Sequence, residues 1–196
     1  MKYFAQGLVG AVLIAAAGPS VAQDGACTFA GETWELTSDQ VAALYECIGD
    51  DLAAGYAAGG DPVGSVYRDW GVTSTAAYAP GPHGDRLLLT FANDVAYDAY
   101  VAYAAEDGFA MPVGSVLAKE SFSLTDEGAP RPGPLFVMTR VAAGIADDYG
   151  GWVYAAVQPD GSEMGISQDF CSACHAAFET QDSLGYPAVE VRLDPR

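Results

Sequence analysis

Residues 171 to 175 carry the side chains most able to do chemistry in this chain, in the order Cys-Ser-Ala-Cys-His. Two thiols separated by two residues and followed directly by a histidine form the C-x-x-C-H pattern of covalent haem attachment. Cys171 and Cys174 would add to the two vinyl groups of one haem, and His175 would offer a ring nitrogen to its iron. A redox-active disulfide would not need the histidine. A zinc site would need four ligands, and the chain contains only two histidines to add to these thiols. The pattern therefore predicts one covalently attached haem c with its iron.

The group on the other face of the iron would decide what this haem does. A strong sixth ligand favours electron transfer, whereas an open position allows small molecules to bind. His83 is the only other histidine, and its proline- and glycine-rich loop leaves it either a solvated turn residue or a ligand. Methionine offers a thioether but more often fills gaps in a core; the candidates are Met111, Met138 and Met164. None of these residues stands out, so the sequence favours a five-coordinate iron.

The other two cysteines, Cys27 and Cys47, lie near the start of the chain with no histidine close by. In an exported protein such a pair is expected to oxidise. We expect a structural disulfide, which would contribute roughly 3 kcal/mol by loop closure.

The first residues have the pattern of an export signal. Met1-Lys2 gives a positive start, an apolar run covers 8–17, and small residues precede a cleavage point after Ala22. A retained N-terminal anchor is the alternative, although the run is short for a membrane span. We therefore expect a signal peptide at 1–22, an N-terminal helical segment with a disulfide at 23–64, a haem domain at 65–196, and a periplasmic location.

The chain is strongly acidic. It has 26 Asp and Glu against 8 Lys and Arg, and loss of residues 1–22 would remove Lys2 and leave a formal charge of −19. Such a surface repels phosphate backbones and anionic lipid, which argues against nucleic-acid binding and against membrane binding after processing. It would attract a basic partner or small cations; the alternative is that the charge serves only solubility in an acidic or saline habitat.

The hydrophobic pattern predicts an α+β fold. Thr37 and Gln40 stand at capping-box spacing before a helix that continues to about Ala57, and Asn93 would cap a mid-chain helix over 95–104. Four runs have strand character, at 86–92, 115–122, 135–141 and 152–157, and residues 130–134 are expected to form a rigid connector. Short turns between them suggest an antiparallel β-sheet, followed by a C-terminal haem-bearing helix.

In this setting the chain resembles the cytochrome P-460 family, related to the c-prime-beta cytochromes. The resemblance covers roughly residues 65 to 187, and the segments that carry it are Tyr67–Trp70, His83–Gly84, Phe91–Ala96, Pro112–Glu120, Gly133–Met138, Gly151–Tyr154, Pro159–Gly161 and Cys171–His175. The P-x-G-S-x-x-x-K-E and G-W-x-Y segments, in this order, are the more specific part.

The resemblance implies a sheet-rich haem protein that is often a homodimer. Family members oxidise hydroxylamine or bind nitric oxide at a five-coordinate iron, and in the enzymes a lysine is also cross-linked to the haem. Lys119 is the only lysine after Lys2, so such a cross-link must use it; an exposed lysine paired with Glu120 is the alternative. Arginines could balance the haem propionates; the candidates are Arg68, Arg86 and Arg140.

Three functions follow from these features. The first is a five-coordinate haem protein that binds or oxidises NO or hydroxylamine, as sensor, scavenger or oxidoreductase. The second is a six-coordinate electron-transfer cytochrome that docks with a basic partner. The third, a structural or peroxide-handling haem, lacks an evident acid–base pair. Asp169 and Glu179 are the acidic residues nearest the motif, and both are expected to be exposed.

Overall fold

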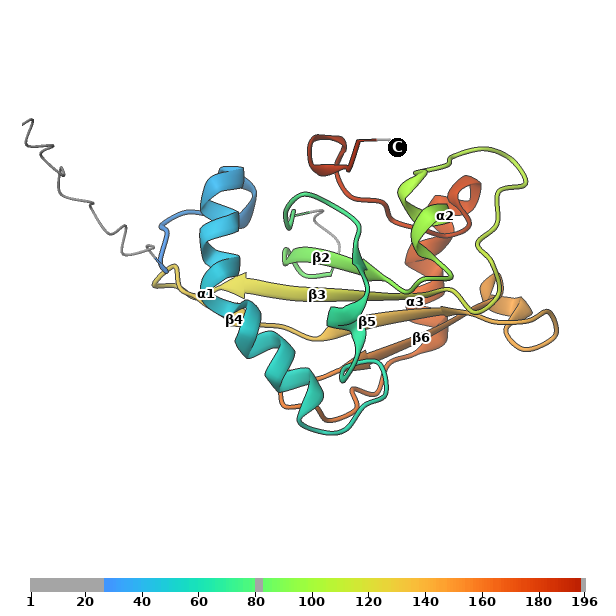
Figure 1. Ribbon diagram of the computed structural model, residues 1–196, viewed down its shortest axis with the longest axis horizontal. Helices are drawn as coiled ribbons and strands as arrows, with labels where there is room; N and C mark the ends of the chain where they lie inside the picture. The colour runs from blue at the N-terminus through green and yellow to red at the C-terminus, as the bar shows by residue number, and fades with distance from the viewer. Residues whose placement is uncertain (1–26, 80–82, 195–196) are drawn as a thin grey trace, which may run out of the picture.

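The computed structural model describes residues 27–79 and 83–194 and has the α+β architecture that the sequence predicts (Figure 1). One antiparallel sheet runs through the molecule, and helices pack on both of its faces. The predicted signal peptide lies outside the described residues. No helix in the described part of the chain is long and apolar enough to cross a membrane.

The sheet has the strand order β1-β2-β3-β5-β6, with β4 paired to β3. Its strands are β1 Gly71–Val72, β2 Leu87–Ala92, β3 Val116–Leu124, β4 Pro130–Pro132, β5 Leu135–Arg140 and β6 Trp152–Val157. The four predicted strands are confirmed, with bounds that shift by at most two residues. The structure adds β1, and it adds β4 inside the expected connector. Two prolines are tolerated in β4 because it pairs with β3 alone and needs few N–H donors.

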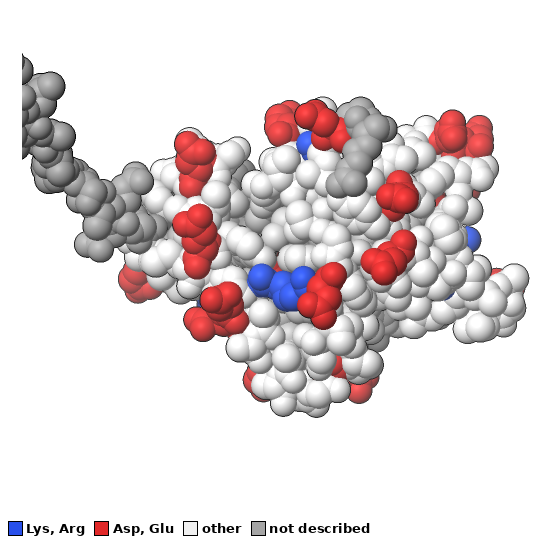
Figure 2. All heavy atoms as spheres, viewed as in Figure 1, with Lys and Arg blue, Asp and Glu red and all other residues white. Residues whose placement is uncertain are grey.

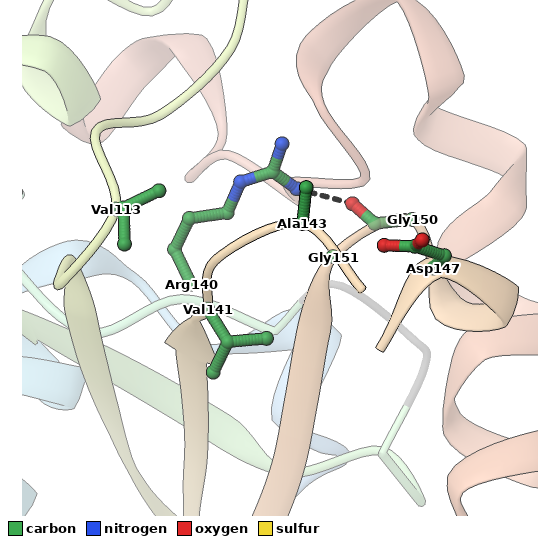
Figure 3. Close-up of a pocket in the computed structure, with 7 residues that line it drawn as sticks. All are labelled: Val113, Arg140, Val141, Ala143, Asp147, Gly150 and Gly151. Carbon is green, nitrogen blue, oxygen red and sulfur yellow. Dashed lines mark hydrogen bonds between the residues drawn. The ribbon is translucent and has the colours of Figure 1, made fainter. Parts of the chain in front are cut away.

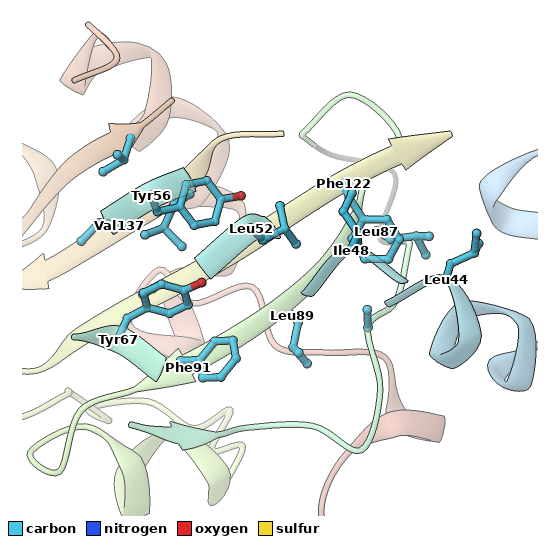
Figure 4. Packing of buried hydrophobic residues seen from close by; sticks show 14 of the residues in the cluster. Leu44, Ile48, Leu52, Tyr56, Tyr67, Leu87, Leu89, Phe91, Phe122 and Val137 are labelled. Atoms are coloured by element: carbon cyan, nitrogen blue, oxygen red, sulfur yellow. The ribbon is translucent and has the colours of Figure 1, made fainter. Parts of the chain in front are cut away.

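The first helix, α1 (Ser38–Ala57), follows the predicted pattern closely. The side chain of Thr37 accepts a hydrogen bond from the backbone of Gln40, and the Gln40 side chain accepts one from Thr37, which makes a capping box. Residues at helical spacing on one face are buried against the sheet, as Figure 4 shows: Leu44, Ile48, Leu52 and Tyr56 pack with Phe91, Phe122 and Val137. A disulfide joins Cys27 to Cys47 in this helix, with Cα atoms 5.9 Å apart.

The remaining helices are short. α2 spans Tyr97–Val101 and α3 spans Gln168–His175; short stretches of 3-10 helix occur at Thr33–Glu35, Tyr67–Asp69, Asp147–Tyr149, Ala176–Gln181 and Val189–Val191. The mid-chain helix is shorter than predicted, because Tyr103 adopts a left-handed φ of 49° just after it. Asn93 still acts near its start, since its side-chain oxygen accepts a hydrogen bond from the Ala96 backbone at 3.1 Å.

Strand alternation gives the sheet two different faces. Ala118, Glu120 and Phe122 of β3 point toward α1, whereas Leu117 and Lys119 point to the opposite face. That second face carries its own apolar cluster, in which Met138 and Trp152 pack with residues of α2 and of the C-terminal segment. The sequence neighbours Lys119 and Glu120 therefore lie on opposite sides of the sheet.

Glu120 is fully buried on the α1 face and is held by three partners. Its carboxylate lies 2.7 Å from the Arg68 Nε, accepts a hydrogen bond from Tyr45 at 2.7 Å, and accepts another from Tyr67. Burial raises the pKa of Glu120, while the hydrogen bonds and the Arg68 charge act in the opposite direction. The network ties α1, the turn before β1 and the central strand together.

We expect Glu120→Ala to lower the free energy of unfolding by about 3–5 kcal/mol, because it leaves the Arg68 charge and two tyrosine hydroxyls without their acceptor. Glu120→Gln keeps an acceptor oxygen of nearly the same shape and should cost less. Urea unfolding of both variants, followed by circular dichroism, measures the difference. Equal losses in the two variants would contradict this account of the network.

Candidate cofactor site

A cavity of about 940 Å³ opens between the second face of the sheet and the segment that follows β6. Its volume is toward the upper end of the roughly 300–1,000 Å³ typical of ligand pockets. The walls are mostly apolar, with Leu117, Phe136 and Ile166 among the contributors. A large, flat, apolar group with a few polar edges would suit such a space.

Helix α3 positions the Cys-x-x-Cys-His motif at this cavity. The side chain of Gln168 accepts a hydrogen bond from the Tyr154 backbone at 2.8 Å and donates one to the Tyr154 carbonyl at 2.6 Å. These bonds fix the first turn of α3 to β6, and the Ser167 side chain caps the helix by accepting from Phe170 at 3.3 Å. The motif therefore lies on a helix whose start is attached to the sheet at a defined place.

Cys171, Cys174 and His175 all line the cavity. Both cysteines are free thiols, with Cys171 partly buried and Cys174 exposed. Burial raises the pKa of the Cys171 thiol. Residues three apart on a helix lie on the same face, so the two sulfur atoms are presented to one side of the cavity.

The imidazole of His175 is buried and held in one orientation. Its Nδ1 lies 2.7 Å from the carbonyl oxygen of Ser183, and since a carbonyl can only accept, Nδ1 carries the hydrogen. Nε2 is then the nitrogen with a free lone pair, which is the arrangement used by histidine ligands of metals. Burial, aided by Lys119, lowers the pKa of His175 and so favours the neutral form that binds metals.

Lys119 reaches the same cavity from the middle of β3. Its Nζ lies 3.5 Å from the carbonyl of Gly185, and burial lowers its pKa to about 8. The alternative of an exposed lysine paired with Glu120 is wrong, because the two side chains point to opposite faces and Glu120 pairs with Arg68. Lys119 has no salt bridge within the described residues.

His83 lies at the cavity wall rather than in a solvated turn. Its ring packs edge-on against Phe136 with centroids 4.5 Å apart, and its centroid lies 6.3 Å from that of His175. The Nδ1 atom is buried and has no hydrogen-bond partner among residues 27–79 and 83–194. Burial lowers the pKa of His83 to about 3, with smaller contributions from the positive charges of Lys119 and Arg86.

The arginines divide differently from the sequence-based expectation. Arg140 points away from the cavity into a separate pocket of about 310 Å³, where it donates to the Gly150 carbonyl (Figure 3) and lies 3.3 Å from Asp182. Its guanidinium also lies 5.6 Å from the centroid of the Trp152 ring. Arg86 is the arginine that lines the cavity, whereas Arg68 belongs to the Glu120 network. A contact to a haem propionate therefore fits Arg86 and not Arg140.

The three methionines that the sequence offers as iron ligands also differ in their position relative to the cavity. Met138 and Met164 line the cavity, whereas Met111 is buried in the neighbouring apolar cluster. Asp169 and Glu179 are exposed as expected. Among the described residues no Asp or Glu lines the cavity, although the chain as a whole is strongly acidic.

These features fit a haem. The cavity offers a preset imidazole, two thiols on one helix face, apolar walls, and the cations Lys119 and Arg86 for the anionic propionates. Residues of the wall also carry buried polar atoms that have no partner within the described residues, namely the hydroxyls of Tyr154 and Tyr186 and the His83 Nδ1. Buried polar atoms in a folded protein normally have hydrogen-bond partners, and a bound cofactor could supply them here.

The comparison with protein families agrees with this geometry. The family model described as Cytochrome P460 matches residues 65–184. The chain belongs to the cytochrome P460 family. It is therefore a haem c protein with an iron centre, of a family whose members are generally secreted. A search of curated proteins gives no significant match. The matched region begins after α1 and contains the whole sheet, α2 and α3.

Sequence reasoning missed the side of the sheet on which Lys119 and Arg86 lie. The signal was available in the alternation of β3, because Leu117, Lys119 and Ser121 must share a face. The alternation alone does not tell which face of β3 borders the cavity, because the residues that cover each face come from distant parts of the chain.

If Cys171 and Cys174 hold the haem, the variant Cys171→Ala/Cys174→Ala produced in a host with cytochrome c maturation should lose covalent haem completely. The control Cys27→Ser/Cys47→Ser should keep it, since that disulfide lies on the other side of the sheet. Haem staining after denaturing electrophoresis reads out both. Covalent haem in the first variant would contradict the assignment.

Proposed function

We propose that this chain is an exported, mono-haem c-type cytochrome that binds or oxidises small nitrogen species such as NO or hydroxylamine. Cys171 and Cys174 would form the two thioether bonds, and His175 would be an axial ligand. When bound, the haem would supply an iron that can take a small ligand and accept electrons from it. The family match and the cavity geometry support this proposal together.

The observation that carries the nitrogen chemistry is the position of Lys119. The resemblance implies that family members which oxidise hydroxylamine have a lysine cross-linked to the haem, and Lys119 is the only lysine after Lys2. Its amine faces the cavity and is partly buried, and burial lowers its pKa to about 8, so that about a tenth of the amine is uncharged at pH 7. An uncharged amine is the form that can make a covalent bond.

The cavity also suits a neutral substrate. Its polar side chains are two cations, two imidazoles, tyrosine hydroxyls and the motif thiols, with no carboxylate among the described residues. Hydroxylamine and NO are small and uncharged at neutral pH, and the acidic outer surface would not repel them. The uncharged form of the Lys119 amine is a group of this wall that could accept a proton from such a substrate.

The proposed location is the periplasm, after removal of residues 1–22. A pair of cysteines joined by a disulfide, Cys27–Cys47, fits an oxidising compartment. Covalent attachment of haem to C-x-x-C-H also takes place outside the cytoplasm.

Electron transfer is the second candidate, and the acidic surface favours it. Figure 2 shows Asp and Glu side chains spread over one face of the molecule, with few basic groups among them. Such a surface would steer a basic redox partner, and the rate would fall with added salt. An electron carrier of this kind would keep its iron low-spin and would not take NO.

Absorption spectra separate the two functions. We expect the ferrous holoprotein to change its Soret band on addition of NO or CO, and we expect hydroxylamine to reduce an added electron acceptor in its presence. A low-spin spectrum that no added NO or CO alters would contradict the first proposal and leave electron transfer.

Lys119 can be tested by mass spectrometry of the haem-bearing peptide. If Lys119 is joined to the haem, digestion should give one fragment that contains both the Cys171–His175 segment and the Lys119 segment. Lys119→Arg keeps the positive charge and should lose the second attachment and the hydroxylamine activity but not the haem. The control Arg131→Gln, at an exposed cation of β4, should change none of these. Activity in Lys119→Arg equal to that of the wild type would exclude a role for the lysine.

A further inference from the structure

The structure brings the two histidines of the chain to the same cavity from opposite ends of the domain. His175 comes from the end of α3, and His83 comes from the turn before β2. Nothing in the sequence pattern requires them to meet, because 92 residues separate them. The ring centroids are nevertheless only 6.3 Å apart, and the rings are tilted by 69° to one another.

This separation has the size expected for two imidazoles that share one metal ion. A metal–nitrogen bond to histidine is about 2.0–2.1 Å long, and the nitrogen lies roughly 1 Å from its own ring centre. Two imidazoles on opposite sides of one metal ion therefore have centroids roughly 6 Å apart. The observed distance agrees with this value.

The ring of His83 is fixed in orientation, and its nitrogens are free to bind a metal. Phe136 packs against its ring at 4.5 Å and limits its orientation, while the ring makes no hydrogen bond within the described residues. An imidazole with a buried, unpaired nitrogen costs about 1–3 kcal/mol unless some other group satisfies it. Coordination to a metal would satisfy the ring, and Nδ1 and Nε2 are the two nitrogens able to do so.

The other donors of the wall make no comparable pair with His175. Met138 belongs to the packed apolar cluster of the second face, and Met164, which follows β6, lines the cavity but pairs with neither histidine ring. The ring of Tyr154 also lies near that of His175, with centroids 5.1 Å apart and planes tilted by 55°, but a neutral tyrosine is a weak ligand. Burial keeps the Tyr154 hydroxyl protonated by raising its pKa to about 12.

We infer that His83 is the second axial ligand of the haem iron, on the face opposite His175, and that a small molecule reaches the iron only by displacing it. This inference rests on the proposed attachment of the haem at Cys171 and Cys174. It replaces the expectation of a five-coordinate resting iron, and it deepens the proposed function, because His83 then controls access to the reactive position.

The backbone at His83 allows a clean test. Its φ is 70°, in the left-handed region that glycine adopts without strain, so His83→Gly should leave the turn intact. We expect wild-type holoprotein to be low-spin in both oxidation states and His83→Gly to become high-spin. Free imidazole added to His83→Gly should restore the low-spin spectrum. The matched control Met164→Leu should stay low-spin.

Ligand binding gives a second readout. If His83 occupies the iron in about 90% of molecules, its removal should raise the apparent affinity for CO roughly tenfold. The CO-binding rate of the wild type should level off at high CO, because loss of His83 becomes limiting, whereas that of His83→Gly should keep rising.

The outcomes separate this inference from the proposed function. A high-spin wild type, or a His83→Gly spectrum identical to that of the wild type, would overturn the role of His83 whatever the nitrogen chemistry. A spin change in His83→Gly without NO binding by either protein would uphold His83 as the ligand and reject the proposed function. Haem staining of each variant shows that the cofactor is still attached.

Discussion

The alternation of side chains along β3 is the constraint on which the rest of the molecule depends. It sends Glu120 into the core beneath α1 and Lys119 into the cavity on the other face, one residue apart. The sheet therefore separates the α1 face, whose contacts stabilise the fold, from the cavity face, whose side chains can bind a cofactor. Because the sheet keeps Glu120 and Lys119 apart, the two opposite charges do not pair with each other and Lys119 stays available to the cavity.

The α1 face shows what that separation allows. A buried carboxylate is acceptable there because Arg68, Tyr45 and Tyr67 satisfy it, and the disulfide at Cys47 holds the same helix from its outer side. On the opposite face the cavity is free of carboxylates within the described residues, so its cations remain available to a bound group. An acidic chain can in this way maintain a locally positive interior.

Much of this arrangement could be predicted from the sequence. The capping box at Thr37, the four apolar strand runs and the Cys-x-x-Cys-His motif are local patterns, and local patterns determine elements. What could not be predicted depends on contacts between distant segments. Arg140 and Arg86 look equivalent in the sequence, and only the pairing of Arg140 with Asp182 removes it from the site. The sequence leaves His83 open as either a solvated turn residue or a ligand, because nothing local indicates that the chain after β6 folds back beside it.

The same long-range character has a consequence for assembly. The carbonyl that orients His175 belongs to Ser183, and the segment 183–188 closes the cavity beside the sheet. Segment 183–188 follows every strand of the sheet in the chain, so α1 and the sheet can fold before this segment closes over the cavity. After the proposed export, a flat porphyrin can enter edge-on through the side that is still open. Closure of the segment then brings the Ser183 carbonyl to His175, so the step that encloses the haem also orients its ligand.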